Sequence, residues 1–134
     1  MFAGQAQKEG YVNETSARID ALLHGAIEGE MAIPPATPID GLCWLVGISP
    51  TGEWAGQSGK IAARQAGNWL FFTARDGMKL LNRATGQEIR YQSGWQVAAR
   101  PIAPTGGTTI DTEARSAIAA IMVSLTTAGV IPAV

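Results

Sequence analysis

Short apolar runs separated by turn-forming residues are the feature that most constrains the fold of this 134-residue chain. Runs of four to six residues recur between residues 42 and 99, and glycine-containing turn sequences stand between most of them. Strands with this spacing and these turn signals are typical of an antiparallel meander. We therefore predict six strands, at Leu42–Val46, Lys60–Gln65, Trp69–Thr73, Met78–Leu81, Gln87–Tyr91 and Trp95–Ala99.

A helix is predicted before the strands. Asn13 can cap its first turn, and Gly29 can end it because glycine enters the left-handed conformation without steric cost. Between these two residues, apolar side chains recur at the three- and four-residue spacing of one helical face. The helix is expected over Glu14–Glu28, with this face formed by Ile19, Leu22, Leu23, Ala26 and Ile27.

The remaining segments set the predicted boundaries. Residues 1–10 are small and polar, and we expect residues 1–12 to form an arm that becomes ordered only against another molecule. Met31–Asp40 contains three prolines, which predicts an extended connection and not a strand. Residues 13–100 are expected to form the domain, and residues 101–134 a linker and a second helix. The predicted fold class is therefore α+β, a small antiparallel β-meander flanked by an N-terminal and a C-terminal helix.

The C-terminal helix carries the most regular pattern in the chain. Asp111 or Thr109 can cap it, and Gly129 can end it after Ala128. Its apolar residues are spaced four, three, four and three, as in a heptad seam. Packing on the sheet and self-association explain such a stripe equally well. The candidate oligomer interface consists of Ala114, Ile118, Ile121, Leu125 and Ala128.

Composition excludes several classes of partner. With 46% hydrophobic and 16% charged residues, the chain is expected to fold around a core. Ten basic and eleven acidic residues form no long run, so we expect no nucleic-acid binding, which needs a concentrated basic patch. No stretch approaches the roughly 20 apolar residues of a membrane span, so no membrane insertion is expected. Cys43, the single cysteine, lies in an apolar run that predicts a buried, inert thiol.

The sequence gives little support for a catalytic or metal site. His24 is the only histidine, so no histidine pair for a metal exists, and nothing near it indicates a Ser-His-Asp triad. The segment Gly56–Lys60 lacks the first glycine and the final hydroxyl residue of a phosphate-binding loop. We expect no catalytic residues, metal or cofactor. Paired carboxylates of a small polysaccharide hydrolase remain a weaker alternative, drawn from Asp40, Glu53, Asp76 and Glu88.

The aromatic residues allow two interpretations. Trp44, Trp69 and Trp95 each begin or lie in a predicted strand, where large aromatic side chains usually cover a sheet. Trp54 lies in a glycine-rich loop, where burial and exposure are equally expected. A carbohydrate-binding module is the alternative, because exposed aromatic rings can stack on sugars. Its stacking residues would be Trp54, Tyr91 and Trp95.

The order of several motifs resembles a known family. The series begins at Gln5-Ala6-Gln7-Lys8-Glu9 and continues through Arg18-Ile19-Asp20-Ala21-Leu22 and Pro34-Pro35. It then includes Trp44-Leu45-Val46 and Thr51-Gly52-Glu53-Trp54-Ala55-Gly56. As a set, these motifs resemble the uncharacterised domains carried by tail-fibre-like proteins of alphaproteobacterial phages and gene transfer agents. Gly106–Asp111 and the helix after it resemble the C-terminal end of phage tail-fibre and tail-tip proteins.

This resemblance implies a virion component of a phage-like tail, made in the host cytoplasm. Such a protein acts by assembly with other tail proteins and by contact with the host surface, and the resemblance leaves its ligand open. A host-surface polysaccharide would suit both this role and the carbohydrate-binding alternative. The resemblance carries no catalytic residues over to this chain. Because fibres are usually trimers, it implies a homotrimer by analogy.

Overall fold

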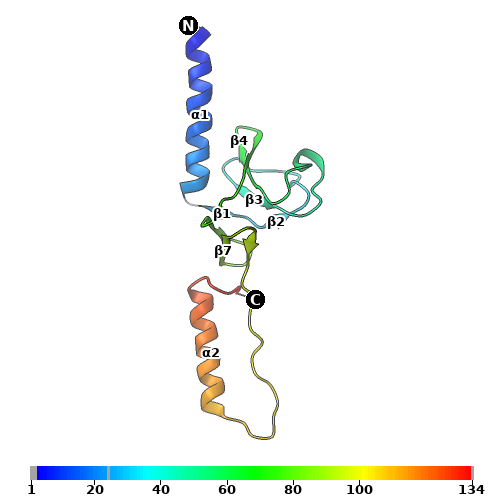
Figure 1. Cartoon of the computed structure of the whole chain (residues 1–134), viewed down its shortest axis with the longest axis vertical. Helices are drawn as coiled ribbons and strands as arrows, with labels where there is room; N and C mark the ends of the chain where they lie inside the picture. Colours follow the sequence, from blue (N-terminus) through cyan, green and yellow to red (C-terminus); the bar gives the residue numbers. More distant parts are fainter. Residues whose placement is uncertain (1–2, 24, 134) are drawn as a thin grey trace.

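The computed structural model describes residues 3–23 and 25–133, with side chains from Lys8 onward. It shows an α+β fold in which helix α1 (Ala3–Leu23) and helix α2 (Thr112–Thr127) flank a small β domain (Figure 1). The predicted fold class is thus confirmed, although the strands form two sheets instead of one meander. The strands are β1 (Ala26–Ile27), β2 (Glu30–Met31), β3 (Cys43–Val46), β4 (Ile61–Gln65), β5 (Asn68–Phe72), β6 (Lys79–Asn82), β7 (Gln87–Tyr91) and β8 (Trp95–Gln96).

Each sheet is a three-stranded antiparallel meander extended by one short parallel strand. The strand orders are β2-β3-β4-β5 and β1-β6-β7-β8, with β2 and β1 as the parallel members. The β4–β5 hairpin closes through Ala66 and Gly67, both at positive φ, as a two-residue turn requires. The last strand is shorter than predicted, because the carbonyl of Ala98 accepts a hydrogen bond from the Gln87 side chain and does not join a ladder.

One extended segment, Ala26–Met31, joins the two sheets. Its first half pairs with β6 and its second half with β3. Between the halves, Gly29 has φ of 156°, which residues with a Cβ rarely adopt. The sheets are therefore connected by backbone hydrogen bonds of a single segment as well as by side-chain packing. The sequence did not reveal this, since it placed Ala26 and Ile27 in a helix and Met31 in a connection without strands.

Helix α1 corrects the predicted boundaries at both ends. It begins at Ala3 and runs through the expected arm and through the expected cap, Asn13. Gly10 inside a helix costs about 1 kcal/mol but does not prevent helix formation. The helix ends at Leu23, close to Gly25, where a Cβ would lie 2.6 Å from Leu80 Cδ2. Gly25 is thus the glycine that the fold needs here, because the chain passes so close to β6.

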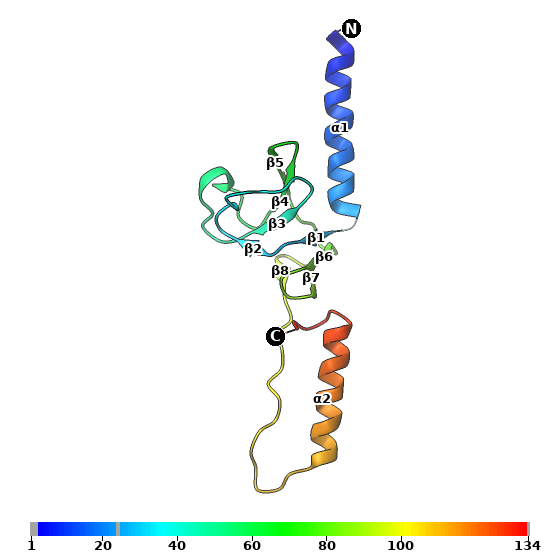
Figure 2. The same ribbon diagram turned by 180° about the vertical axis from the view of Figure 1, so that it is seen from behind.

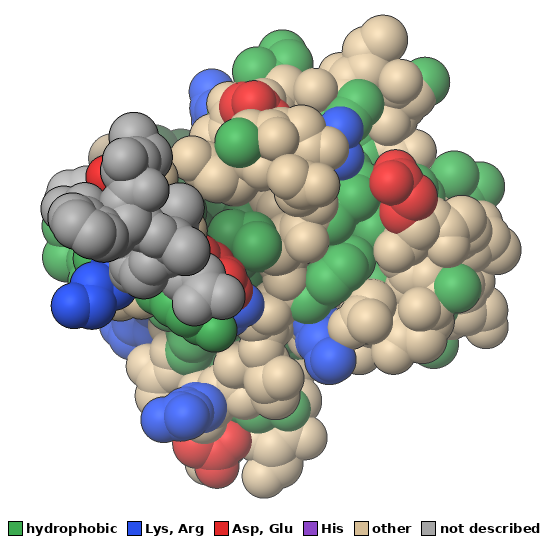
Figure 3. Space-filling view, turned by 90° about the horizontal axis from the view of Figure 1, so that it is seen from above, with side chains coloured by type: hydrophobic (Ala, Val, Ile, Leu, Met, Phe, Trp, Pro, Cys, Tyr) green, Lys and Arg blue, Asp and Glu red, His purple; other side chains and the backbone are tan. Residues whose placement is uncertain are grey.

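Two apolar clusters fill the domain. The first lies between the sheets and includes Ile27, Leu45, Phe72 and Leu80. The second covers the other face of the β2–β5 sheet, because successive side chains of a strand point to opposite faces. A short 3-10 helix, Gly52–Trp54, places Trp54 in this second cluster, which also contains Trp44, Val46 and Ala62. From above, hydrophobic side chains are visible in a hollow between polar parts of the surface (Figure 3).

The second cluster makes a prediction for stability. Replacing the fully buried Trp54 by alanine should lower the free energy of unfolding by about 3–5 kcal/mol, since a large core side chain is lost and a cavity remains. Urea denaturation followed by circular dichroism measures this change. Ile102→Ala is the control, because Ile102 is 94% exposed and its truncation should change stability by less than about 0.5 kcal/mol. Equal effects of the two substitutions would contradict the assignment of Trp54 to the core.

Candidate functional site

The C-terminal helix forms where the sequence predicted it. The Asp111 side chain accepts a 2.8 Å hydrogen bond from the backbone N–H of Ala114, which caps the first turn. Gly129, at φ of 69°, ends the helix, and the N–H of Val130 donates to the carbonyl of Leu125. Helix α2 is therefore defined by its own termini, independently of packing along its length.

Two polar side chains hold the C-terminal end of α2: Gln87 of β7 connects it to the β domain, and Arg100 connects it to the start of the linker. Gln87 is completely buried, and its Nε2 donates to the carbonyls of Ala98 (2.7 Å) and Val130 (3.2 Å). Arg100 Nη1 donates to the Thr126 hydroxyl and to the carbonyls of Pro132 and Ala133, at 2.9–3.1 Å. Residues 99–129 thus form an arm, a linker followed by α2, with both ends held at the β domain (Figure 2).

Most side chains of α2 are exposed. The side chain of Met122 is buried, and its neighbours Arg115 and Thr126 bond to Gly106 and Arg100. Beside this face, the candidate interface faces solvent: Ile118 is 41% and Ile121 57% exposed. Ala114 and Ala128 are exposed too, and Leu125 is half-buried. Packing on the sheet was one of the two explanations of the heptad seam of α2, and it does not account for these exposed residues. Self-association, the other explanation, stays a prediction.

The arm leads to a testable prediction. Arg100→Ala should release the C-terminal end of α2, because three hydrogen bonds from one guanidinium group are lost. We expect limited proteolysis within residues 97–134 to become at least about tenfold faster, the effect of about 1.4 kcal/mol on local opening. Arg75→Ala is the matched control, because Arg75 is an exposed arginine of the β domain. Unchanged cleavage in Arg100→Ala would show that Arg100 does not hold the arm.

Helix α1 leaves its large apolar residues exposed. Ala17 and Ala21 are half-buried on the inner side, and Ala21 packs against the core. A row of large apolar residues, here called the outer stripe, lies about 200° around the helix from these two alanines. It consists of Val12 (63% exposed), Ile19 (58%) and Leu23 (69%). This is the reverse of an ordinary surface helix, in which large apolar residues face the core.

A groove separates α1 from the β4–β5 hairpin. Its volume is about 1030 Å³, and Ile19, Leu23 and Leu70 form the apolar part of its lining. Glu14 and Asp20 add carboxylates to the rim. Arg18 is occupied elsewhere, since it pairs with Glu14 at 2.7 Å and lies over the Phe72 ring at 5.4 Å. The groove is therefore continuous with the outer stripe of α1.

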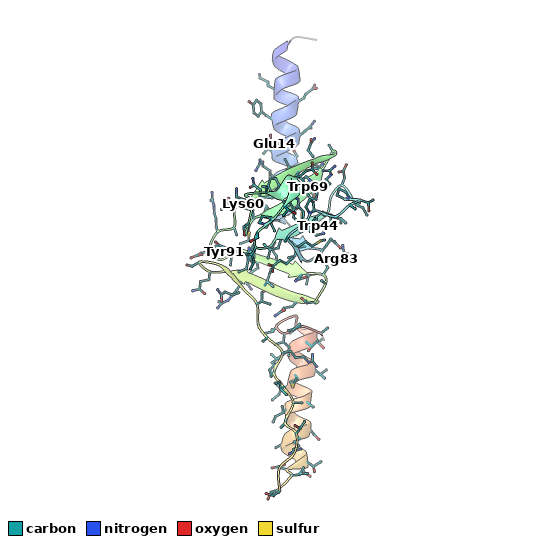
Figure 4. The ribbon with its side chains drawn as sticks, turned by 90° about the vertical axis from the view of Figure 1, so that its right-hand side faces the viewer. Glu14, Trp44, Lys60, Trp69, Arg83 and Tyr91 are labelled. Carbon is teal, nitrogen blue, oxygen red and sulfur yellow. The ribbon has the colours of Figure 1, made fainter. Side chains whose placement is uncertain are left out.

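The predicted glycan-stacking residues do not form one site. Trp54 is completely buried, with ring centroids 5.0 Å from Trp69 and 6.4 Å from Trp44, so its ring cannot stack on a sugar. Figure 4 shows Trp44 and Trp69 together in the domain and Tyr91 apart from them. Tyr91 and Trp95 form an edge-to-face pair at 5.2 Å, both half-buried. The Trp95 indole N–H donates to the carbonyl of Gly59.

The four carboxylates of the hydrolase alternative each have a structural contact. Asp40 accepts from the N–H of Gly67, Glu53 from the Trp69 indole, and Asp76 from the N–H of Ser93. Glu88 pairs with Lys79 at 2.9 Å. These contacts connect loops and strands, as turn and surface residues commonly do.

The remaining candidates for chemistry are the cysteine, the lysine of the loop that resembles a phosphate-binding loop, and the histidine. The Cys43 thiol is buried, and this burial, with the nearby Asp20 and Glu28, raises its pKa above the usual value, which makes the thiol less reactive. Lys60 Nζ, in the segment that superficially resembles a phosphate loop, donates to Gln57. His24 lies outside the described residues. Within residues 3–23 and 25–133, no three His, Cys, Asp or Glu side chains gather as metal ligands.

The fold and these surfaces define a small α+β domain with two projecting helices. Residues 12–96 match the sequence profile of a family described as Protein of unknown function (DUF2793). The chain belongs to this family. A comparison with curated proteins found no match. No helix in the described part of the chain has the length and apolar character needed to span a bilayer. The family match ends at Gln96, so the arm lies outside it.

The sequence did not fully predict two features: the exposed stripe of α1 and the polar contacts that hold the arm. The outer stripe of α1 was partly visible, because Ile19 and Leu23 were assigned to one helical face. Periodicity, however, does not say which molecule covers a face, and Ala26 and Ile27 proved to lie in β1. Gln87 and Arg100 had no local signal at all, since their partners lie 11 to 43 residues away in the sequence.

Proposed function

We propose that this protein is a structural component of a phage-like tail, which acts by assembly with copies of itself and with other tail proteins. The observation that carries the proposal is the exposure of large apolar side chains on both helices. Burying an Ile, Leu or Val side chain fully is worth about 1.5–3 kcal/mol, so several such residues on projecting helices favour association strongly. The motif order that resembles tail-fibre-like proteins supplies the tail context.

The polar chemistry of the described residues supports this proposal over an enzyme. Each acidic residue considered for hydrolysis accepts a hydrogen bond or ion pair that connects parts of the domain. The buried thiol has a raised pKa, which disfavours the nucleophilic thiolate. A protein that works through surface complementarity needs neither group.

Contact with the host surface is part of the same proposal. Tyr91 and Trp95 are the two predicted stacking residues that keep some exposure, and they lie together on β7 and β8. A partly exposed aromatic pair can contribute to the binding of a surface polysaccharide. Without Trp54 the pair is small, so assembly is the role that the geometry favours.

Fractionation of particles tests the proposal. An epitope-tagged chain, expressed in the cell that produces it, should sediment with purified tailed particles in a density gradient and remain with them after a high-salt wash. Hydrophobic interfaces survive salt, whereas adventitious charge contacts are screened. Immunoblotting of the fractions provides the measurement. A soluble protein with the same tag is the control, and a chain that stays in the particle-free fractions would contradict the proposal.

A further inference from the structure

We infer that a cleft between strands β6 to β8 and the end of α2 binds the carboxylate of an acidic polysaccharide, and that Lys79 and Arg90 are the groups that contact this carboxylate. The inference deepens the host-contact part of the proposed function and rests on it for its biological setting. It names the chemical class of the ligand and places the site on the face of the sheet that points away from the core.

The cleft lies where the arm returns to the β domain. Its volume is about 410 Å³, within the range of roughly 300–1,000 Å³ that is usual for small-molecule sites. Strands β6 and β7 supply one wall, residues 128–130 after α2 supply another, and residues 96–98 complete the lining. Figure 2 shows the end of α2 beside β7. The N–H of Glu88 donates to the carbonyl of Gly129 at 2.7 Å, which holds these two walls together.

The strand register places three donor side chains in one row across the sheet. Lys79 on β6 lies directly opposite Arg90 on β7, and Arg90 lies opposite Gln96 on β8. Residues opposite each other on neighbouring strands share a face of the sheet, with Cβ atoms about 4.5–5.5 Å apart. All three side chains are exposed, whereas Leu80 and Ile89 of the same strands are buried between the sheets. An ammonium, a guanidinium and an amide group can therefore contact one ligand together.

The charges of this row favour a singly charged anion. Like charges directly opposite each other destabilise a sheet. Glu88 compensates Lys79, since its Oε1 lies 2.9 Å from Lys79 Nζ. Among the side chains that the structure describes, no carboxylate pairs with the Arg90 guanidinium. One positive charge thus remains, which matches a carboxylate better than a phosphate group of about −1.5 to −2. A planar guanidinium also binds a carboxylate through two parallel hydrogen bonds.

The rest of the lining suits a sugar better than an acidic peptide. Val97 and Val130, 58% and 47% exposed, supply apolar surface for the C–H groups of a sugar ring. The Gln96 amide and the Glu88 carboxylate supply acceptors for sugar hydroxyls. A peptide rich in carboxylates would instead be repelled by Glu88. The cleft therefore combines a site for one carboxylate with acceptors for neighbouring hydroxyl groups.

A second pocket extends the site toward the aromatic pair. Its volume is about 340 Å³, and it shares Lys79 and Arg90 with the cleft. Tyr91 contributes to its lining, and Trp95 lies edge-to-face with Tyr91 at 5.2 Å. A chain of sugar residues can thus continue from the carboxylate site to the exposed part of Tyr91. This continuity favours a polysaccharide over an isolated small anion.

Isothermal titration calorimetry on the full-length chain tests the ligand class. The acidic probes are oligomers of galacturonate and of alginate, which carry one carboxylate per sugar residue. Methyl-esterified oligogalacturonate is the matched neutral probe. We expect both acidic oligomers to bind, and the neutral oligomer to bind at least about tenfold more weakly, because charge-assisted hydrogen bonds to the carboxylate are lost.

Substitutions test the assigned residues. Arg90→Gln and Lys79→Gln should each weaken the binding of oligogalacturonate at least about tenfold, since each removes a charged donor. Arg83→Gln is the matched control, because Arg83 is an exposed arginine of the same domain that pairs with Glu28. It lines neither pocket, and Figure 4 shows it on the opposite side of the domain from Tyr91. Circular dichroism verifies that each variant is folded.

Four results would overturn the inference. They are binding of neither acidic oligomer, equal binding of the neutral oligomer, an equal loss of affinity in Arg83→Gln, and unchanged affinity in both Arg90→Gln and Lys79→Gln. Tighter binding of dextran sulfate or of poly-glutamate than of oligogalacturonate would overturn it too, because the site would then select sulfate groups or acidic peptides. Particle fractionation reports on tail association without any polysaccharide, so failure of the site and failure of the proposed function can be distinguished.

Discussion

Burial of aliphatic side chains is the constraint on which this structure depends. Within the β domain the constraint is met, since two apolar clusters cover both faces of the β2–β5 sheet. On the helices it is not met, because the outer stripe of α1 and the seam of α2 face solvent. Most of the stability of a helix in a protein comes from tertiary packing of its apolar face. Burial of apolar surface stabilises the fold of the domain, and it therefore also favours assembly.

The two helices are joined to the β domain in different ways. The segment Ala26–Met31 pairs with both sheets, so the domain behaves as one unit to which α1 is directly joined. At the other end, Gln87 and Arg100 hold the two ends of the arm. The family match covers most of the unit but not the arm.

Local patterns predicted those elements whose partners lie nearby in the chain. Strands β3 to β7 lie within about two residues of their predicted positions, and Asp111 and Gly129 define α2 as expected. The parallel strands β1 and β2 were missed, because two residues carry no periodicity and β1 pairs with β6 more than 50 residues later. Trp54 was undecided for a similar reason. Its loop sequence suggested exposure as readily as burial, and only the fold of the sheet beneath it settles the matter.

The central claim is the proposal that the exposed apolar residues of both helices join copies of this chain. Sedimentation equilibrium from low to high micromolar concentration tests it most directly. We predict an oligomer whose mass is a multiple of 14.0 kDa and that dissociates on dilution, and a shift to single copies in the double variant Ile19→Asp, Ile121→Asp. Asn13→Asp with Ser116→Asp adds the same charges elsewhere on the two helices and should keep the assembly. A chain that remains at 14.0 kDa at the highest concentration, with its helix content intact by circular dichroism, would contradict the claim.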